Sequence, residues 1–177
     1  MISIRWHGRG GQGCFTAARL LGAAAVNAGR YALAFPSFGP ERRGAPVLGF
    51  TRIDDAPITD RSEVSECDGV VVLDDTLLND RAVVGLRPGG WFVANTRLST
   101  VPFLPEGVRF TALDAWELAR QILGKPIVNT AMLGALIAAS NVVPVSDAAK
   151  AIEEDPGVNQ AEKNKALFLK AWHQVTG

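Results

Sequence analysis

The stretch "HGRGGQG", residues His7–Gly13, decides the fold because it joins two different periodicities. Before it, apolar and polar residues alternate from Ile2 to Trp6, and a period of two predicts a β-strand. After it, residues 12–27 are rich in Ala and Leu at helical spacing, with Gly29 placed to end the helix. Four glycines in seven positions allow backbone conformations that other residues avoid, so we expect a tight strand-to-helix turn that something approaches closely.

The rest of the chain alternates between strand and helix patterns. "GVVVLDD", residues 69–75, is a continuous apolar run that ends in acids, which is typical of a strand covered on both faces of a parallel sheet. The other predicted strands cover 31–35, 47–53, 91–95 and 108–113, and the other predicted helices cover 76–84, 115–123, 130–140, 146–154 and 160–175. This order predicts an α/β fold: a single domain over 1–177 with a mostly parallel sheet, helices on both faces and a Rossmann-like start.

The composition excludes several classes of protein. The chain has 177 residues, enough for one core, and 47% of them are hydrophobic and 20% charged, as in a soluble globular protein. Lys plus Arg equal Asp plus Glu at 18 each, so no net charge attracts nucleic acid or an anionic membrane. We find no secretory signal and no apolar run of membrane-spanning length. Cys14 and Cys67 are too few for a disulfide framework, a zinc site or an iron–sulfur cluster, so we expect a cytoplasmic protein without a metal of its own.

Gly8, Gly10 and Gly13 satisfy the G-x-G-x-x-G fingerprint of dinucleotide-binding folds, in the required strand, turn and helix context. In such a site the helix N-terminus holds the pyrophosphate, and an acid at the end of the second strand binds the ribose. Residues 30–39, "RYALAFPSFG", contain no acid, and the first one follows in the next loop at Glu41. The missing acid argues against an NAD or FAD site. A free-standing Rossmann-type nucleotide-binding oxidoreductase is therefore the alternative function, not the first.

Two other interpretations of the glycine turn stay open at this point. In one, the glycines only form a tight turn and let the helix pack closely on the sheet. In the other, the turn is a docking surface or a partial phosphate cradle that another polypeptide completes. Gln12 favours the second interpretation, because an amide at a helix start offers hydrogen-bond donors.

Four segments carry a family resemblance. "HGRGGQG" is followed by "FGPERRGAPV" (Phe38–Val47), "RIDDAPI" (Arg52–Ile58) and "NTAMLGAL" (Asn129–Leu136). In this order they closely resemble the gamma subunit, or gamma domain, of 2-oxoacid:ferredoxin oxidoreductases, and the resemblance extends over essentially the whole chain. "ERRGAPV" is similar to the pyruvate and branched-chain branch, because Ala45 stands where the 2-oxoglutarate-like branch more often has a second glycine.

The resemblance implies a subunit of a larger enzyme that is not catalytic by itself. Family members oxidatively decarboxylate a 2-oxoacid on thiamine diphosphate with Mg²⁺, pass electrons through [4Fe–4S] clusters, and usually capture the acyl group with coenzyme A. The implied partners are alpha, beta and delta-type subunits, with ferredoxin or a flavin or NAD subunit as acceptor. With two separated cysteines and no G-D-G opening of a thiamine diphosphate site, this chain alone is expected to bind none of these cofactors. Pyruvate is the first expected substrate, before branched-chain or aromatic 2-oxoacids such as phenylglyoxylate.

The residues expected to contact coenzyme A or a neighbouring subunit lie in the glycine turn and in the proline-flanked loop before the third strand. Both segments are expected beyond the carboxyl ends of strands, where ligands bind in open α/β sheets. Two adjacent guanidinium groups are suited to bidentate binding of a phosphate or carboxylate, although the loop is also consistent with a solvated Glu–Arg pair. The predicted contact residues are Gly8, Gly10, Gly11, Gln12, Gly13, Arg42 and Arg43, and no catalytic or metal-binding residue is assigned.

Other chemically active side chains have structural interpretations. Cys14 is expected to pack as a small apolar group, and His7 and His173 are assigned no role as a general base. Asp74 and Asp75 end a parallel strand, where site carboxylates are common, but a helix-capping role for Asp75 fits equally well. The segment "AMLGALIAAS" is apolar almost all round, so we expect it to be buried against its own sheet or partly against another subunit.

Overall fold

A computed structural model of the chain describes residues 1–37 and 43–177. The six strands within these ranges form one sheet in the order β2-β3-β1-β4-β5-β6. Their bounds are Ile2–Arg9 (β1), Tyr31–Pro36 (β2), Pro46–Asp54 (β3), Cys67–Val72 (β4), Leu86–Asn95 (β5) and Arg109–Leu113 (β6). β1, β4, β5 and β6 run parallel, whereas β3 runs antiparallel to both β1 and β2. The predicted mostly parallel sheet is confirmed, with one reversed strand.

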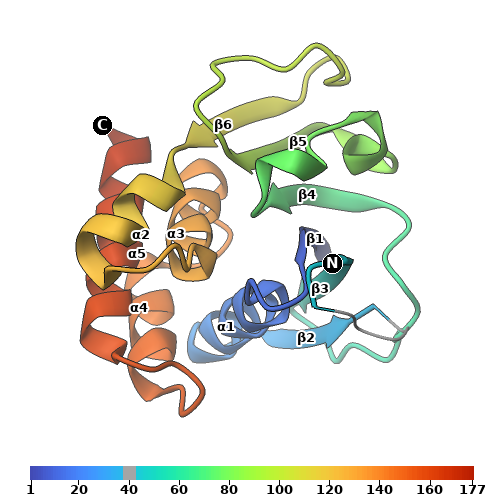
Figure 1. The fold of residues 1–177 in the computed structure, drawn as a ribbon. Helices are drawn as coiled ribbons and strands as arrows, with labels where there is room; N and C mark the ends of the chain where they lie inside the picture. The colour runs from blue at the N-terminus through green and yellow to red at the C-terminus, as the bar shows by residue number, and fades with distance from the viewer. Residues whose placement is uncertain (38–42) are drawn as a thin grey trace.

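The five α-helices of the described chain cover the same face of the sheet (Figure 1). They are α1 (Cys14–Asn27), α2 (Ala115–Leu123), α3 (Asn129–Ser140), α4 (Val145–Glu154) and α5 (Ala161–Thr176). One hydrophobic cluster combines their buried side chains with strand residues such as Trp6, Val71 and Val93. The other face carries a second cluster, which two 3₁₀ helices, η1 (Asp75–Leu77) and η2 (Asp80–Val83), cover together with loops.

The prediction of an α-helix over 76–84 is wrong. Two short polar side chains bind the backbone here instead: Asp74, just before the segment, accepts a hydrogen bond from the Thr76 N–H, and Asn79, inside it, accepts one from the Arg81 N–H. Bonds of this kind compete with regular helix formation, and here each one begins a separate short turn. Within the described residues, the five α-helices lie on one face and the two 3₁₀ helices lie on the other. The predicted placement of helices on both faces therefore holds only when the 3₁₀ helices are counted.

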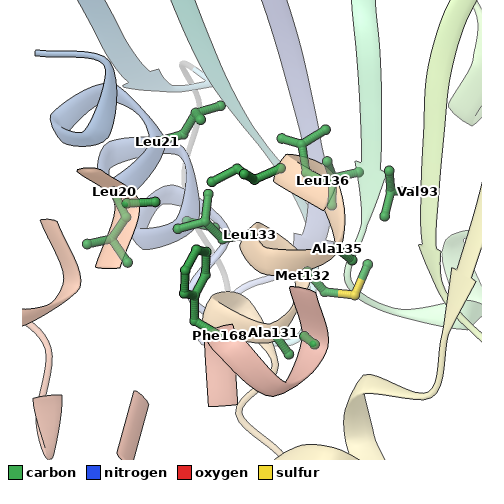
Figure 2. Packing of buried hydrophobic residues seen from close by; sticks show 14 of the residues in the cluster. Leu20, Leu21, Val93, Ala131, Met132, Leu133, Ala135, Leu136 and Phe168 are labelled. Carbon is green, nitrogen blue, oxygen red and sulfur yellow. The ribbon is translucent and has the colours of Figure 1, made fainter. Parts of the chain in front are cut away.

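α3 is buried on every side along most of its length. Its apolar side chains from Ala131 to Ile137 are at most 1% exposed. Figure 2 shows Leu133 beside Phe168 of α5, in the same cluster as the sheet residues. A Cβ added at Gly134 would lie 2.4 Å from the carbonyl oxygen of Phe168, so the two helices approach closely at this glycine. The chain's own core therefore accounts for the apolar character of this segment without another subunit.

The last helix, α5, packs onto the core as its apolar stripe predicts. Leu167, Phe168 and Ala171 are fully buried, and Trp172 and Val175 pack against them at the edge of the cluster. Among the described residues, no helix combines the length and the apolar character that crossing a membrane requires.

Candidate functional site

The carboxyl ends of β1 and β4 lie next to each other where the order of the sheet reverses. After β1 the chain crosses through α1 to β2 and β3 on one side, whereas β5 and β6 continue the sheet from β4 on the other side (Figure 1). Open α/β sheets bind ligands at such a switch point. The glycine turn follows β1 and Asp74 follows β4, so both border this place.

The close approach to the glycine turn comes from the chain itself. Gly11 (φ 91°) and Gly13 (φ 76°) adopt left-handed conformations that favour glycine. A Cβ added at Gly13 would lie 2.5 Å from Nδ2 of Asn129, the first residue of α3. The N-termini of α1 and α3 therefore meet at Gly13, and a side chain at this position would have to displace the side chain of Asn129.

The loop before β3 that carries Arg42 and Arg43, called here the arginine loop, is attached to the same turn through its described residues 43–45. The Gly10 N–H donates to the carbonyl oxygen of Ala45 at 2.8 Å, and the Gly44 N–H donates to the carbonyl oxygen of Gly10 at 3.1 Å. Arg43 forms a parallel bridge with Gly10, and its side chain is exposed. The fold thus brings Arg43 to the glycine turn, whereas Arg42 of the predicted set lies outside the described residues.

The predicted contact residues of the turn differ in exposure. Gly8 and Gly10 are buried, and a Cβ added at Gly8 would lie 3.2 Å from Cβ of Cys14. Gln12 and Gly13 are half-buried. Gly11 is exposed, and no atom lies within 4 Å of a Cβ added there. Of the described members of the predicted set, Gly11 and Arg43 are therefore the two that are exposed to solvent.

A hydrogen-bond network connects the turn to the end of β4. Oε1 of Gln12 accepts from the Arg9 N–H at 2.8 Å, and its Nε2 donates to Oδ2 of Asp74 at 2.6 Å. Oδ1 of Asp74 accepts from the N–H and the hydroxyl of Thr76 at 3.0 and 2.5 Å. The Arg9 guanidinium donates to Thr76 Oγ1 at 2.7 Å and to the Gly44 carbonyl oxygen at 3.0 Å. Three segments that are distant in sequence are held together here.

Asp74 is ionised in this network. Burial alone would raise its pKa, but the hydrogen bonds from Thr76 and Gln12 and the nearby charge of Arg9 together lower the pKa below its ordinary value. The Arg9 Nε lies 3.6 Å from Oδ2 of Asp74, so the buried carboxylate has a cationic partner. The sequence analysis assigned no role to Arg9 or Thr76. The one signal for Arg9 was its position as a cation between two glycines of the turn, and its partner Asp74 follows β4.

The histidine and cysteine next to the turn have structural roles. Arg5 Nε donates to Nε2 of His7 at 3.0 Å, and burial together with the Arg5 charge lowers the pKa of His7 from 6.5 to about 3. His7 is therefore a neutral hydrogen-bond acceptor. Cys14 is 3% exposed, and its thiol donates to the Trp6 carbonyl oxygen at 3.3 Å. The packing role expected for Cys14 is confirmed.

The helix cap proposed for Asp75 belongs to its neighbour. Asp74 begins η1, and Asp75 is an exposed member of that short helix. Asp75 instead borders a cavity of about 600 Å³ at the carboxyl ends of β5 and β6. Trp116 and Leu98 contribute apolar surface to this cavity, and the ion pair Arg97–Asp114 lies in its wall. Among the residues described, no three His, Cys, Asp or Glu side chains are grouped to hold a metal ion.

Comparison with known proteins places this fold in a family. A profile described as "Pyruvate ferredoxin/flavodoxin oxidoreductase" matches residues 3–173. The chain belongs to this family. It is 47% identical to the "Pyruvate/ketoisovalerate oxidoreductases common subunit gamma" of Thermococcus kodakarensis, over 99% of this chain and 97% of that protein. It is also 47% identical to the "Pyruvate synthase subunit PorC" of Methanocaldococcus jannaschii, again over 99% and 97% of the two chains.

Solved structures agree with this family assignment. The pyruvate oxidoreductase subunit PORC of Thermotoga maritima has a TM-score of 0.82 and 35% identity, and the match covers 97% of this chain and 95% of that chain. A 2-oxoglutarate:ferredoxin oxidoreductase from Magnetococcus marinus has a TM-score of 0.72 at 21% identity, and it shows the same fold in 30% of a longer chain. The resemblance carried by the four sequence segments is confirmed.

Proposed function

We propose that this chain is the gamma subunit of a multi-subunit 2-oxoacid:ferredoxin oxidoreductase of the pyruvate type. The supporting observation is its 47% identity, over nearly the full length of both chains, to a protein named as a common subunit gamma. The complex converts a 2-oxoacid, coenzyme A and an oxidised acceptor into acyl-coenzyme A, carbon dioxide and the reduced acceptor. Following the family resemblance, thiamine diphosphate, Mg²⁺ and the [4Fe–4S] clusters reside on alpha, beta and delta-type subunits.

The contribution of this chain is structural and electrostatic. Its histidine and cysteine nearest the turn are engaged in internal contacts, because His7 accepts from Arg5 and Cys14 donates to Trp6. The chain supports the catalytic subunits structurally. The edge of its sheet at the carboxyl ends of β1 and β4 faces the route by which coenzyme A enters. Cytoplasmic location belongs to the same proposal, since the clusters and free thiols of such a complex require a reducing compartment.

Gly11 and Arg43 are the groups that meet coenzyme A in this proposal. Gly11 lets a phosphate approach the backbone because it has no side chain, and the Arg43 guanidinium is suited to bidentate phosphate binding. Among the described residues Arg43 forms no ion pair, and the nearby negative charge of Asp74 is balanced by Arg9. A neighbouring subunit's carboxylate is the competing occupant, and the following experiment separates the two.

The test is Arg43→Ala in the assembled complex, with Arg61→Ala as the matched control at another exposed arginine. We expect the KM for coenzyme A to rise about tenfold with assembly and turnover retained, because one charge-assisted contact is lost. If the complex dissociates while the KM of the remaining assembly is unchanged, Arg43 contacts a subunit instead. Unchanged assembly, KM and turnover together would remove both roles.

The free-standing nucleotide-binding alternative has less support. β2, Tyr31–Pro36, ends without an acid that could bind a ribose. The switch point beside the turn is also occupied by the chain's own side chains, since Gln12 bonds to Asp74 and Asn129 packs on Gly13.

A further inference from the structure

The side chain of Gln12 has one favourable orientation because its two polar atoms have different partners. Its oxygen accepts from the Arg9 N–H at 2.8 Å, and its nitrogen donates to the Asp74 carboxylate at 2.6 Å. Exchanging the two atoms would place a donor against a donor and an acceptor against an acceptor. The carboxylate of Asp74 therefore fixes the amide, and the amide fixes the backbone at the start of the turn.

Asp74 is a rigid anchor for this arrangement. It lies two residues beyond the end of the central strand β4, and it is 6% exposed. Its second carboxylate oxygen accepts from both the N–H and the hydroxyl of Thr76. With both oxygens occupied, its side chain has no freedom to follow a displaced turn.

A second path leads from Asp74 to the arginine loop. Thr76, held by Asp74, accepts from the Arg9 guanidinium at 2.7 Å. The other terminal nitrogen of Arg9 donates to the carbonyl oxygen of Gly44, which directly follows Arg43. The segments that carry the two exposed groups, Gly11 in the turn and Arg43 in the loop, are thus both connected by hydrogen bonds to the carboxylate of Asp74.

We infer that Asp74 is a positioning residue: through Gln12 and through Thr76 and Arg9, it sets the relative placement of Gly11 and Arg43. It does so without contacting the ligand, from which its own burial separates it. The inference rests on the proposed coenzyme A role of that surface. It predicts that the polarity of the Gln12–Asp74 hydrogen bond, rather than the presence of either residue alone, determines coenzyme A binding.

The experiment exchanges the donor and the acceptor of this bond in the assembled complex. Asp74→Asn places two NH₂ groups opposite each other or loses the Thr76 bond, and Gln12→Glu places two carboxylates opposite each other. The double variant Gln12→Glu with Asp74→Asn restores one donor and one acceptor at the same net charge. The carboxylate introduced at position 12 then accepts from the Arg9 N–H and from the amide introduced at position 74, and the oxygen of that amide still accepts from Thr76.

We expect each single variant to raise the KM for coenzyme A about five- to tenfold with kcat within about twofold, and the double variant to return it to within about twofold of the original. Thr76→Val, at an exposed position, tests the second path by the same readout if the buried variants do not fold. A purely structural role would lower the amount of assembled complex without this separation of KM from kcat.

The outcomes distinguish the inference from the proposed function. If Arg43→Ala raises the KM but the Asp74, Gln12 and Thr76 variants do not, the positioning role is refuted and the proposed function stands. The positioning role is also refuted if the single variants raise the KM and the double variant does not restore it. If Arg43→Ala itself has no effect on KM, assembly or turnover, the proposed surface role fails first.

Discussion

His7 illustrates how one residue's surroundings decide its chemistry. A histidine beside a glycine turn is a candidate for a catalytic base, but burial and the Arg5 charge lower the pKa of His7 to about 3. The fold therefore holds the neutral ring, whereas the unfolded chain takes up a proton near 6.5, the ordinary pKa of histidine. Because the unfolded state binds this proton first, the stabilising contribution is complete above pH 6.5 and is lost as the pH falls toward 3.

His7→Gln tests this dependence, since a glutamine oxygen still accepts from Arg5 but does not titrate. We expect the original chain to lose about 2 kcal/mol more than the variant when the pH is lowered from 7 to 5. Urea titration of the purified chains at both pH values measures the free energy of unfolding. His173→Gln, at an exposed position in α5, is the control and should follow the original chain. Identical losses for the original chain and His7→Gln would contradict the assignment.

At the scale of elements, the contact between α3 and α5 depends on a missing side chain. Gly134→Ala places a methyl group 2.4 Å from the Phe168 carbonyl oxygen, and backbone cannot move aside as a flexible side chain does. We expect this variant to lose about 3 kcal/mol in free energy of unfolding because the two helices must separate.

Gly29→Ala is the matched control for this substitution. Gly29 follows α1 with φ 77°, and no atom lies within 4 Å of an added Cβ. It should therefore cost only the left-handed conformation, about 1 kcal/mol. Equal losses for Gly29→Ala and Gly134→Ala in urea titration would show that close helix packing is not what Gly134 provides.

Elements with strong local patterns were predictable from the sequence, and those that depend on side-chain capping were not. Apolar runs placed β4 and α3 correctly, because burial on both faces leaves a continuous signal. The segment 76–84 has enough apolar residues for a helix, but Asp74 and Asn79 bind the backbone and divide it. The reversed direction of β3 also left no mark in its sequence, since a buried strand has the same composition in either direction.

At the scale of the whole molecule, the proposed function requires other subunits. We expect the tagged chain, isolated from its native source, to co-purify with proteins that carry thiamine diphosphate and iron–sulfur absorbance. The purified chain alone should bind NAD(H), NADP(H) and FAD weakly or not at all. The side chains of Gln12, Asp74 and Asn129 fill the space beside the glycine turn where a dinucleotide would lie. Recovery of the chain without partners, together with submicromolar nucleotide binding, would favour the alternative function.

The sequence by itself determined the strand, glycine turn and helix at the start, most later elements, and the family. These depend on periodicity, turn residues and short motifs, which act between neighbouring residues. Only the tertiary structure decided that Asn129 is what approaches Gly13, that Asp74 joins Gln12 and Arg9, and that the five α-helices of the described chain cover one face. Those contacts depend on the order in which strands pair and on where each crossover returns, and distances of that kind are not encoded in any single stretch of chain.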